Sequence, residues 1–405
     1  MPETAVTDPL QPIRWKMNQM LDRVKRARQS GHYFYLQPIQ EFKGARVKVK
    51  GRGEMIMFAS YCYLDLLGHP YIDAAAQAAI RQYSSGTHGV RILAGTLPLH
   101  NQLEHKIAAF KGAEEAIVFS SGYVTNLSVV STLCGRNDVV VSDKLNHASI
   151  VDGCLLSRAQ FVRFRHNDME SLERVLFKAG GDTFKLVVAD AVFSMDGDII
   201  NLPEVVRLCR KYGALLMIDE AHSLGVLGET GHGIEEHFGL QDGVDIHMGT
   251  LSKTIPSVGG YVAGKQGLIE FLKHTARAFV FSAALPPAQT AAAKASFEVI
   301  EQEPERIHCL RRNIDVFIGG LHERGFDTLN SETAIIPVIC GRDEQAMEMA
   351  RRCQDQGLFV LPIVPPAVPE GSSRLRVNVT AGHTLADLDY ALGVLGTAGK
   401  ELGVI

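Results

Sequence analysis

Three groups of chemically active residues each stand directly after a short apolar run. They are the segment 120–126, the segment 219–222 and Lys253. The first contains a Ser-Ser-Gly turn, which at the start of a helix presents backbone N–H groups to an anion. The second supplies carboxylates. A lysine that loses part of its hydration at the mouth of a buried sheet has a lowered pKa, so its amine can attack an aldehyde.

Pyridoxal 5′-phosphate requires these three kinds of group. Its aldehyde bonds to a lysine amine, a carboxylate keeps its ring nitrogen protonated, and its phosphate needs N–H donors. The sequence therefore indicates a pyridoxal 5′-phosphate site in which Lys253 carries the cofactor and Asp219 pairs with the ring nitrogen. The simpler alternatives are an ordinary helix cap at Ser121-Gly122 and a surface lysine at position 253.

The Asp-Glu-Ala-His segment 219–222 also resembles the acidic box of a nucleic-acid helicase, in which the Asp helps to hold Mg²⁺. That function needs an upstream G-x-x-x-x-G-K-[ST] motif to bind the nucleotide phosphates, and the sequence contains none. The segment Gly249 to Thr254 lacks the second glycine and lies downstream. The sequence therefore disfavours a helicase, and no nucleic-acid partner is expected.

Composition narrows the class of protein further. The 405 residues include 41 Lys and Arg against 45 Asp and Glu, which gives a net charge of −4, and 46% are hydrophobic. This balance excludes a disordered chain, a collagen-like chain and a strongly basic nucleic-acid binder. The seven cysteines are widely spaced and form no C-x-x-C pair, so no disulfide framework and no metal site are expected. With no signal-peptide pattern and no apolar run of about 20 residues, the sequence predicts a cytoplasmic protein without a transmembrane segment.

The elements that must position these residues follow from the apolar pattern. Four runs rich in Val and Ile alternate with helical patterns, as in a parallel sheet buried on both faces: 116–119, 139–141, 186–189 and 215–218. A three-layer α/β domain is therefore expected, with ligands beyond the carboxyl ends of the strands. One helix and one strand separate Asp219 from Lys253, so both can end at the same edge of the sheet.

Three parts of the chain are expected. Residues 1–57 form an N-terminal arm with a basic amphipathic helix at 13–29, which either packs on protein or lies on a membrane surface. Residues 58–290 form the large cofactor-binding domain. Residues 291–405 form a smaller α+β domain, entered through a long helix at 288–307 and containing strands at 334–339 and 375–379.

Six motifs in a fixed order give the sequence a family resemblance: Asn146-His147-Ala-Ser-Ile-Val-Asp-Gly153, Val192-Phe-Ser194-Met-Asp-Gly197, Asp219-Glu-Ala-His222, Gly249-Thr250-Leu-Ser-Lys253, Phe281-Ser-Ala-Ala-Leu-Pro-Pro287 and Leu375-Arg376. From about Phe58 to its end, the chain resembles the α-oxoamine synthases. These fold-type I pyridoxal-phosphate enzymes include 8-amino-7-oxononanoate synthase and serine palmitoyltransferase. The segment 162–167 and the last seven residues look most similar to the bacterial serine palmitoyltransferases.

The resemblance implies the aspartate-aminotransferase-like fold of these enzymes and a role for each matching residue. Four residues would be catalytic: Lys253 bonded to the cofactor, Asp219 at its ring nitrogen, His222 at its phenolic oxygen and His147 stacked on its ring. Ser194 would assist near the ring oxygen or the substrate. The phosphate would be held by Ser121, Gly122, Tyr123, Thr250 and, from a second subunit, Ser282. Arg376 would bind the amino-acid carboxylate.

The implied reaction joins a small L-amino acid (serine, alanine or glycine favoured) to an acyl thioester of coenzyme A or acyl-carrier protein. The products are an α-amino ketone, CO₂ and a free thiol, and the implied assembly is a homodimer with active sites at the subunit interface. Within the family, the implied reaction is serine palmitoyltransferase-like, and the alternative is an 8-amino-7-oxononanoate synthase-type or secondary-metabolite synthase that uses a different amino acid. Outside it, the alternatives are an aminotransferase or lyase of the same fold and a non-catalytic protein that has kept the fold. The motifs around His147, Lys253 and Pro287, and the complete set of catalytic residues, argue against them.

Three positions depart from the family pattern. Cys62 stands where relatives usually have an asparagine, which makes it a candidate substrate-binding residue. Val364 replaces a second arginine of several relatives, and Ala283 replaces a frequent Thr or Ser. Because none of these is a predicted catalytic residue, the amino acid and the acyl group are less well defined than the chemistry.

Overall fold

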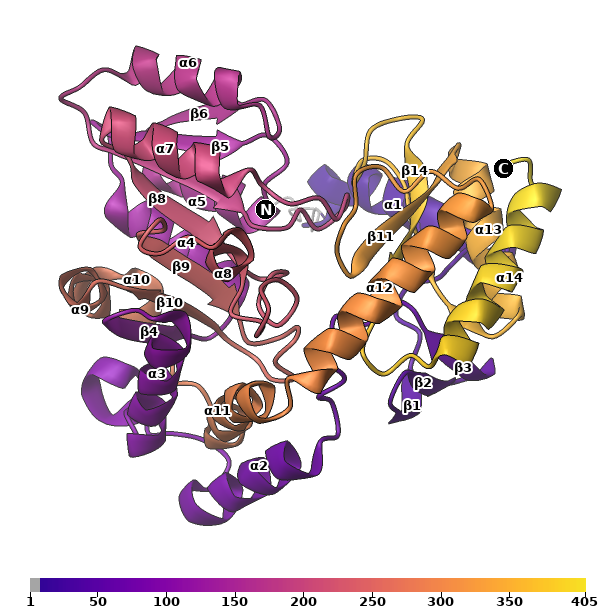
Figure 1. Cartoon of the computed structure of the whole chain (residues 1–405), viewed down its shortest axis with the longest axis horizontal. Helices are drawn as coiled ribbons and strands as arrows, with labels where there is room; N and C mark the ends of the chain where they lie inside the picture. The colour runs from indigo at the N-terminus through magenta and orange to yellow at the C-terminus, as the bar shows by residue number, and fades with distance from the viewer. Residues whose placement is uncertain (1–7) are drawn as a thin grey trace, which may run out of the picture.

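The computed structural model describes residues 8–405, and residues 1–7 of the expected N-terminal arm lie outside the described part. Figure 1 shows a large sheet with its helices at the left of the view and a smaller group of strands and helices at the right, with α12 running from the end of α11 into the smaller group. The three-part division of the chain stays a prediction. The fold class is confirmed: a mostly parallel central sheet and a smaller C-terminal sheet, as in fold-type I transferases.

The central sheet has seven strands, of which six run parallel and one, β10, runs antiparallel to both its neighbours. Side chains alternate between its two faces, as in any strand. Leu186 and Val188 pack into the core on one face, while Val187 and Ala189 pack into the core on the other. In spatial order the strands are β4 (Glu115–Phe119), β10 (Gly260–Gly264), β9 (Ile246–Thr250), β8 (Leu215–Asp219), β7 (Lys185–Asp190), β5 (Val139–Asp143) and β6 (Gln160–Phe164).

Helices cover both faces of this sheet, so its strands are apolar on both sides. One core includes residues of α4 (Gly122–Leu133), α5 (Ala148–Ser157), α9 (Gln266–Thr275) and α10 (Arg277–Val280). The other includes residues of α3 (Pro98–Lys111), α6 (Met169–Ala179), α7 (Leu202–Tyr212), α8 (Ile234–Phe238) and α11 (Pro287–Gln302). Helix α2 (Pro70–Tyr83) packs on α11, and a short π-helical turn, η2, covers Arg91–Gly95. The expected three-layer arrangement is confirmed.

The smaller part contains two sheets. One has the order β11 (Ile335–Gly341), β14 (Ser373–Asn378), β13 (Leu361–Ile363). Helix α13 (Asp343–Asp355) packs on it, and α14 (Leu385–Glu401) packs on α13. The other joins β1 (Ile39–Lys43), β2 (Arg46–Val49) and β3 (Gly53–Met57) to β12 (Leu358–Phe359). Because β12 pairs with β3, residues 39–57 share a sheet with the C-terminal part of the chain.

The expected single helix over 288–307 is wrong. The chain forms α11, which ends at Gln302, and a second helix, α12 (Glu305–Glu323). Pro304 lies between them as the N-cap of α12, because a proline lacks the N–H that would continue α11 and its ring clashes with the preceding turn.

The N-terminal helix α1 (Arg14–Gln29) forms as expected, after a short 3-10 turn, η1 (Gln11–Ile13). It contains no buried residue, and Trp15 on it is 63% exposed. Within residues 8–405, no helix has both the length and the apolar character that a membrane crossing requires.

Candidate active site

The carboxyl ends of the parallel strands bring the predicted residues to one edge of the central sheet. Asp190 and Asp219 are the last residues of β7 and β8 and are paired in register, so their carboxyl groups are neighbours. Thr250 ends β9, and Lys253 follows three residues later. The helix starts at Ser121 and His147 follow β4 and β5 at the same edge. The expected convergence at this edge is therefore present.

Lys253 lies in direct contact with His222. Its Nζ is 2.7 Å from His222 Nε2, and His222 Nδ1 is 2.7 Å from the hydroxyl of Tyr63. Burial lowers the pKa of Lys253 to about 8, although Asp219 and Asp190 oppose the shift. Burial and the nearby positive charge of Lys253 lower the pKa of His222 well below its ordinary value. The pair is therefore a neutral imidazole beside an amine that readily loses its proton.

Asp219 is held by a chain of hydrogen bonds that reaches His147. Asn126 Nδ2 donates to Asp219 Oδ2 at 2.6 Å and lies 3.0 Å from Ser149 Oγ, which in turn lies 2.7 Å from His147 Nδ1. The second oxygen of Asp219 accepts from the N–H of Ala221 at 2.9 Å. Burial and the charge of Asp219 raise the pKa of Asp190 well above its ordinary value. Asp219, which accepts from Asn126 and Ala221, is therefore a carboxylate suited to pair with a cationic ring nitrogen.

The start of α4 forms a cradle that is narrow enough to require glycine. Ser121 caps the helix by accepting from the N–H of Val124 at 3.2 Å, which leaves the first N–H groups of α4 available to an anion. A Cβ on Gly122 would stand 2.9 Å from Thr250 Oγ1. A Cβ on Gly260 would stand 2.7 Å from the Cα of Gly122. Close packing of the backbone at Gly122, next to the Thr250 hydroxyl, fits a phosphate group.

Arg376 is buried, with one donor group left over. Its Nε donates to the carbonyl of Ser194 at 2.5 Å and its Nη1 to Asn378 Oδ1 at 2.9 Å. Its Nη2 is buried and has no partner among the described residues. The Tyr61 ring lies 5.0 Å from the Arg376 guanidinium and 6.0 Å from Lys253 Nζ, so both cations lie near the same ring. An unpaired buried guanidinium nitrogen is costly, so it fits an anionic ligand.

Other predicted residues lie at the border of this group. Tyr123 is 43% exposed, and its hydroxyl bonds to Asp152 while its ring meets His147 edge-on at 6.1 Å. Cys62 is half-buried, its sulfur accepts from the N–H of Leu66, and burial raises the pKa of its thiol. Ser282 follows α10, and among the described residues no hydrogen bond joins it to the Lys253 region.

Reasoning from the sequence missed four residues of the site. Tyr61 and Tyr63 flank Cys62 in a segment whose only distinguishing signal is its departure from the family pattern. Asn126 lies one helical turn after Gly122, which was the available signal for a second residue on the same face of α4. Asp190 ends an apolar run just as Asp219 does, so the same pattern could have identified it.

The family model for class I and II aminotransferases matches residues 53–395. The chain belongs to this family. It is 45% identical over 384 residues to 8-amino-7-oxononanoate synthase of Geobacter sulfurreducens, covering 94% of this chain and 98% of that one. It is 42% identical over 369 residues to serine palmitoyltransferase of Sphingobacterium spiritivorum, covering 91% and 92%.

Solved structures agree with this placement. Serine palmitoyltransferase from S. paucimobilis, with bound pyridoxal phosphate and myriocin, superposes with a TM-score of 0.93 at 35% identity, covering 98% of this chain and 100% of that one. This member of the class I and II aminotransferase family is an α-oxoamine synthase. It is a pyridoxal 5′-phosphate-dependent C-acyltransferase that catalyses a decarboxylative condensation.

Proposed function

We propose that this α-oxoamine synthase joins a small L-amino acid (serine, alanine or glycine) to an acyl thioester of coenzyme A or acyl-carrier protein, and releases CO₂, the thiol and an α-amino ketone. The observation that carries the proposal is the unpaired, buried Nη2 of Arg376. The Arg376 guanidinium and Lys253 Nζ both lie near the Tyr61 ring. An amino acid whose carboxylate bonds to Arg376 then presents its reacting carbon toward Lys253.

The residues present fit pyridoxal 5′-phosphate. Lys253 would be the amine that bonds to its aldehyde, Asp219 would pair with its ring nitrogen and His222 with its phenolic oxygen. His147 would stack on its ring. The phosphate is assigned to Ser121, Gly122, Tyr123 and Thr250, with Ser282 of a second subunit. When bound, the cofactor supplies an electron sink that stabilises negative charge on the carbon next to the amino group.

The chain's own groups then move protons and hold substrates. Because the pKa of Lys253 is about 8, its amine takes a proton from the amino-acid carbon and returns it near neutral pH. Neutral His222 accepts a hydrogen bond from the Lys253 ammonium, which keeps the amine in place. Arg376 fixes the carboxylate, and the Ser194 carbonyl fixes Arg376. Asp219 remains a hydrogen-bonded acceptor throughout.

An apolar hollow beside Tyr61 supports an acyl chain as one substrate. Its volume is about 280 Å³, and its wall includes residues of β1, β2, β3 and β13 and of the segment after β3: Phe42, Val47, Met57, Leu361, Tyr61 and Cys62. Tyr61 lines the hollow and also lies near Lys253 Nζ. An acyl group placed in the hollow would therefore have its thioester end near the reacting amine. Cys62 therefore contributes to the acyl end of the site as well as to its expected amino-acid end.

A cytoplasmic homodimer is the proposed assembly. Phe281, next to Ser282, is 71% exposed, and Leu93 of η2 is 83% exposed. Residues 89–90 contact residues 283–284, so these apolar side chains belong to adjoining segments of one surface. Covering them with a second subunit would remove exposed apolar area and would bring Ser282 to the partner's cradle. The seven cysteines are all free, which suits a reducing compartment.

A matrix of amino acids and acyl thioesters tests the function. We expect one combination to release thiol and CO₂ in equal amounts, with no keto acid. Lys253→Ala should abolish both products. Lys265→Ala, which removes a surface lysine paired with Glu114, should leave them unchanged. Formation of a keto acid without thiol release would assign the chain to aminotransferase chemistry instead.

A further inference from the structure

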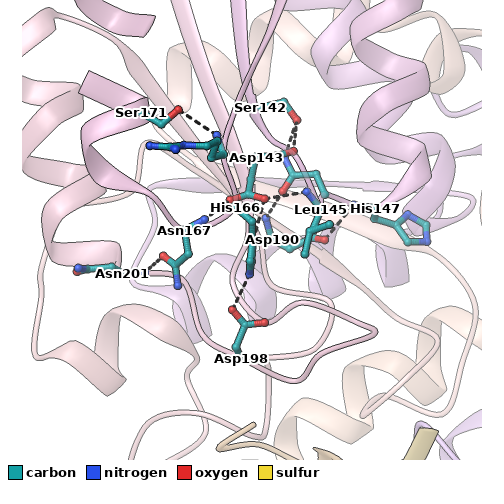
Figure 2. A network of polar contacts seen from close by, with 12 residues as sticks. Ser142, Asp143, Leu145, His147, His166, Asn167, Ser171, Asp190, Asp198 and Asn201 are labelled. Carbon is teal, nitrogen blue, oxygen red and sulfur yellow. Dashed lines mark hydrogen bonds and ion pairs between the residues drawn. The ribbon is translucent and has the colours of Figure 1, made fainter. Parts of the chain in front are cut away.

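His166 lies between two carboxylates outside the residues assigned to the site so far. Figure 2 shows it between Asp143 and Asp198, with His147 in the same network. Its Nδ1 is 3.0 Å from Asp143 Oδ1, and its Nε2 is 2.9 Å from Asp198 Oδ2. An ionised carboxylate only accepts hydrogen bonds, so both ring nitrogens donate and the ring is an imidazolium. Burial acts to lower the pKa of His166, but the bonds to the two carboxylates outweigh it and raise that pKa to about 10.

Asp143 connects His166 to the turn that carries His147. It is the last residue of β5 and is fully buried, and it also accepts from the backbone N–H groups of Leu145 and Asn167, each at 2.8 Å. The N–H of His147 donates to Asp190 Oδ2 at 3.0 Å. The turn from the end of β5 to His147 is therefore held by one aspartate side chain at each end, and His166 bonds to the first of them, Asp143 (Figure 2).

Asp198 connects His166 to the other side of the site. It belongs to the Ser194 hairpin, defined as residues 192–199, in which Val192 pairs with Ile199 and the N–H of Phe193 donates to the Asp198 carbonyl. The Phe193 ring meets the His166 ring edge-on at 4.4 Å. At the tip of the same hairpin, the Ser194 carbonyl accepts from Arg376 Nε. Asp198 thus connects His166 to the hairpin whose Ser194 carbonyl accepts from Arg376.

We propose that His166 is a positioning residue: its imidazolium joins the His147 turn to the Ser194 hairpin and so sets the distance between His147 and Arg376. The roles of His147 and Arg376 in this inference rest on the proposed function. A neutral ring has one donor and one acceptor nitrogen, so one carboxylate would face a lone pair. A buried carboxylate without its donor is destabilised, and the two segments would then separate or admit water.

The first test uses the holoenzyme with His166→Gln, which replaces the two donor nitrogens of the charged ring by one uncharged amide nitrogen. We expect an altered visible circular dichroism band of the bound cofactor, faster amide exchange in 144–150 and 192–199 with and without cofactor, and about 10- to 100-fold weaker amino-acid binding. The matched control is His383→Gln, because His383 is a buried histidine that bonds to Thr380 and the Met57 carbonyl and to neither carboxylate. It should melt at a lower temperature while keeping the wild-type dichroism.

The second test uses Asp198→Asn, which leaves a fold-compatible side chain and one carboxylate, Asp143, against His166. The pKa of His166 then falls from about 10 toward its ordinary value. The cofactor dichroism should gain a titration between about pH 7 and 9, above the ordinary histidine pKa of about 6.5. The wild type and the double variant Asp198→Asn/His166→Gln should both lack this titration. The effect of Asp198→Asn on the dichroism therefore depends on His166, which means that the two single changes are not additive.

The inference is overturned if His166→Gln keeps wild-type exchange and amino-acid affinity, or if the Asp198→Asn titration persists without His166. Should His166→Gln fail to fold, Asp198→Asn compared with the wild type still decides the matter, because a dichroism without the new titration would overturn the inference. Dichroism and exchange require no turnover. A wild-type enzyme that releases no thiol would therefore refute the proposed function and leave the inference about His166 to these two measurements.

Discussion

Arg376→Lys should weaken amino-acid binding by an amount that the structure allows us to calculate. Arg376 uses Nε and Nη1 for Ser194 and Asn378, which leaves Nη2 for the substrate carboxylate. A lysine amine cannot hold both protein partners and also reach the carboxylate. One hydrogen bond to a charged group contributes about 1.5–3 kcal/mol. Since about 1.4 kcal/mol is a tenfold change, Kd for the amino acid should rise about 10- to 150-fold.

The assay is a spectral titration of the purified holoenzyme with the amino acid that turns over. The cofactor content of the variant should match that of the wild type, because Lys253, Asp219 and the phosphate cradle are untouched. KM for the acyl thioester should change little, and the loss should fall on KM for the amino acid. Arg324→Lys is the matched control, since Arg324 is half-buried and donates to the Gly320 carbonyl in the smaller part of the chain.

The reasoning is refuted if Arg376→Lys binds the amino acid as tightly as the wild type while Arg324→Lys behaves the same way. The carboxylate would then be held elsewhere, and the unpaired Nη2 would have no part in substrate binding. Equal losses in both variants would also contradict it, because they would show a general effect of replacing a partly buried arginine.

Three further predictions concern the cofactor and the fold. Because the pKa of Lys253 is lowered to about 8, uptake of pyridoxal 5′-phosphate by the apoprotein should accelerate with the neutral amine up to pH 8 and level off above it; a rate independent of pH would contradict this. Gly122→Ala adds a methyl group 2.9 Å from Thr250 Oγ1. Overpacking of about 1–3 kcal/mol should weaken cofactor binding about 5- to 150-fold in equilibrium dialysis. Glu220→Gln breaks the fully buried bond to Lys111 at 2.6 Å, and denaturant unfolding at pH 7 should show a loss of about 3–5 kcal/mol. Burial opposes ionisation of Glu220, but Lys111 outweighs it and lowers the pKa. The contribution is therefore complete above the ordinary carboxyl pKa of about 4.3 and is lost as the pH falls below it. A gap between wild type and variant that persists in acid would contradict this.

The sheet and its edge could be predicted because their signals are local. Each apolar run of four or so residues encodes its own strand, and the residue after each run marks the carboxyl end. These signals alone place Ser121, Asp219 and Lys253 at one edge of the sheet, whereas His147 was assigned to it through the family resemblance. The break between α11 and α12 was missed although its cause, Pro304, is a single residue, because the apolar pattern continues on both sides of it.

The supporting contacts could not be predicted, since they join segments that are far apart in the chain. Tyr63 and His222 are 159 positions apart, and Asn126 and Asp219 are 93 apart. No periodicity links such pairs; only the completed fold brings them within 3 Å. Ser282 is a different case, because its predicted role requires a second subunit and the geometry of one chain does not test it.

Covalent trapping of the cofactor tests the central claim most directly. Purified holoenzyme is reduced with borohydride, digested, and mapped by mass spectrometry for the pyridoxyl-modified residue. We predict that the modification lies on Lys253, is absent in Lys253→Ala and is unaffected in Lys265→Ala. A pyridoxyl group on another lysine, or none in protein that shows the cofactor band, would contradict the assignment of the site.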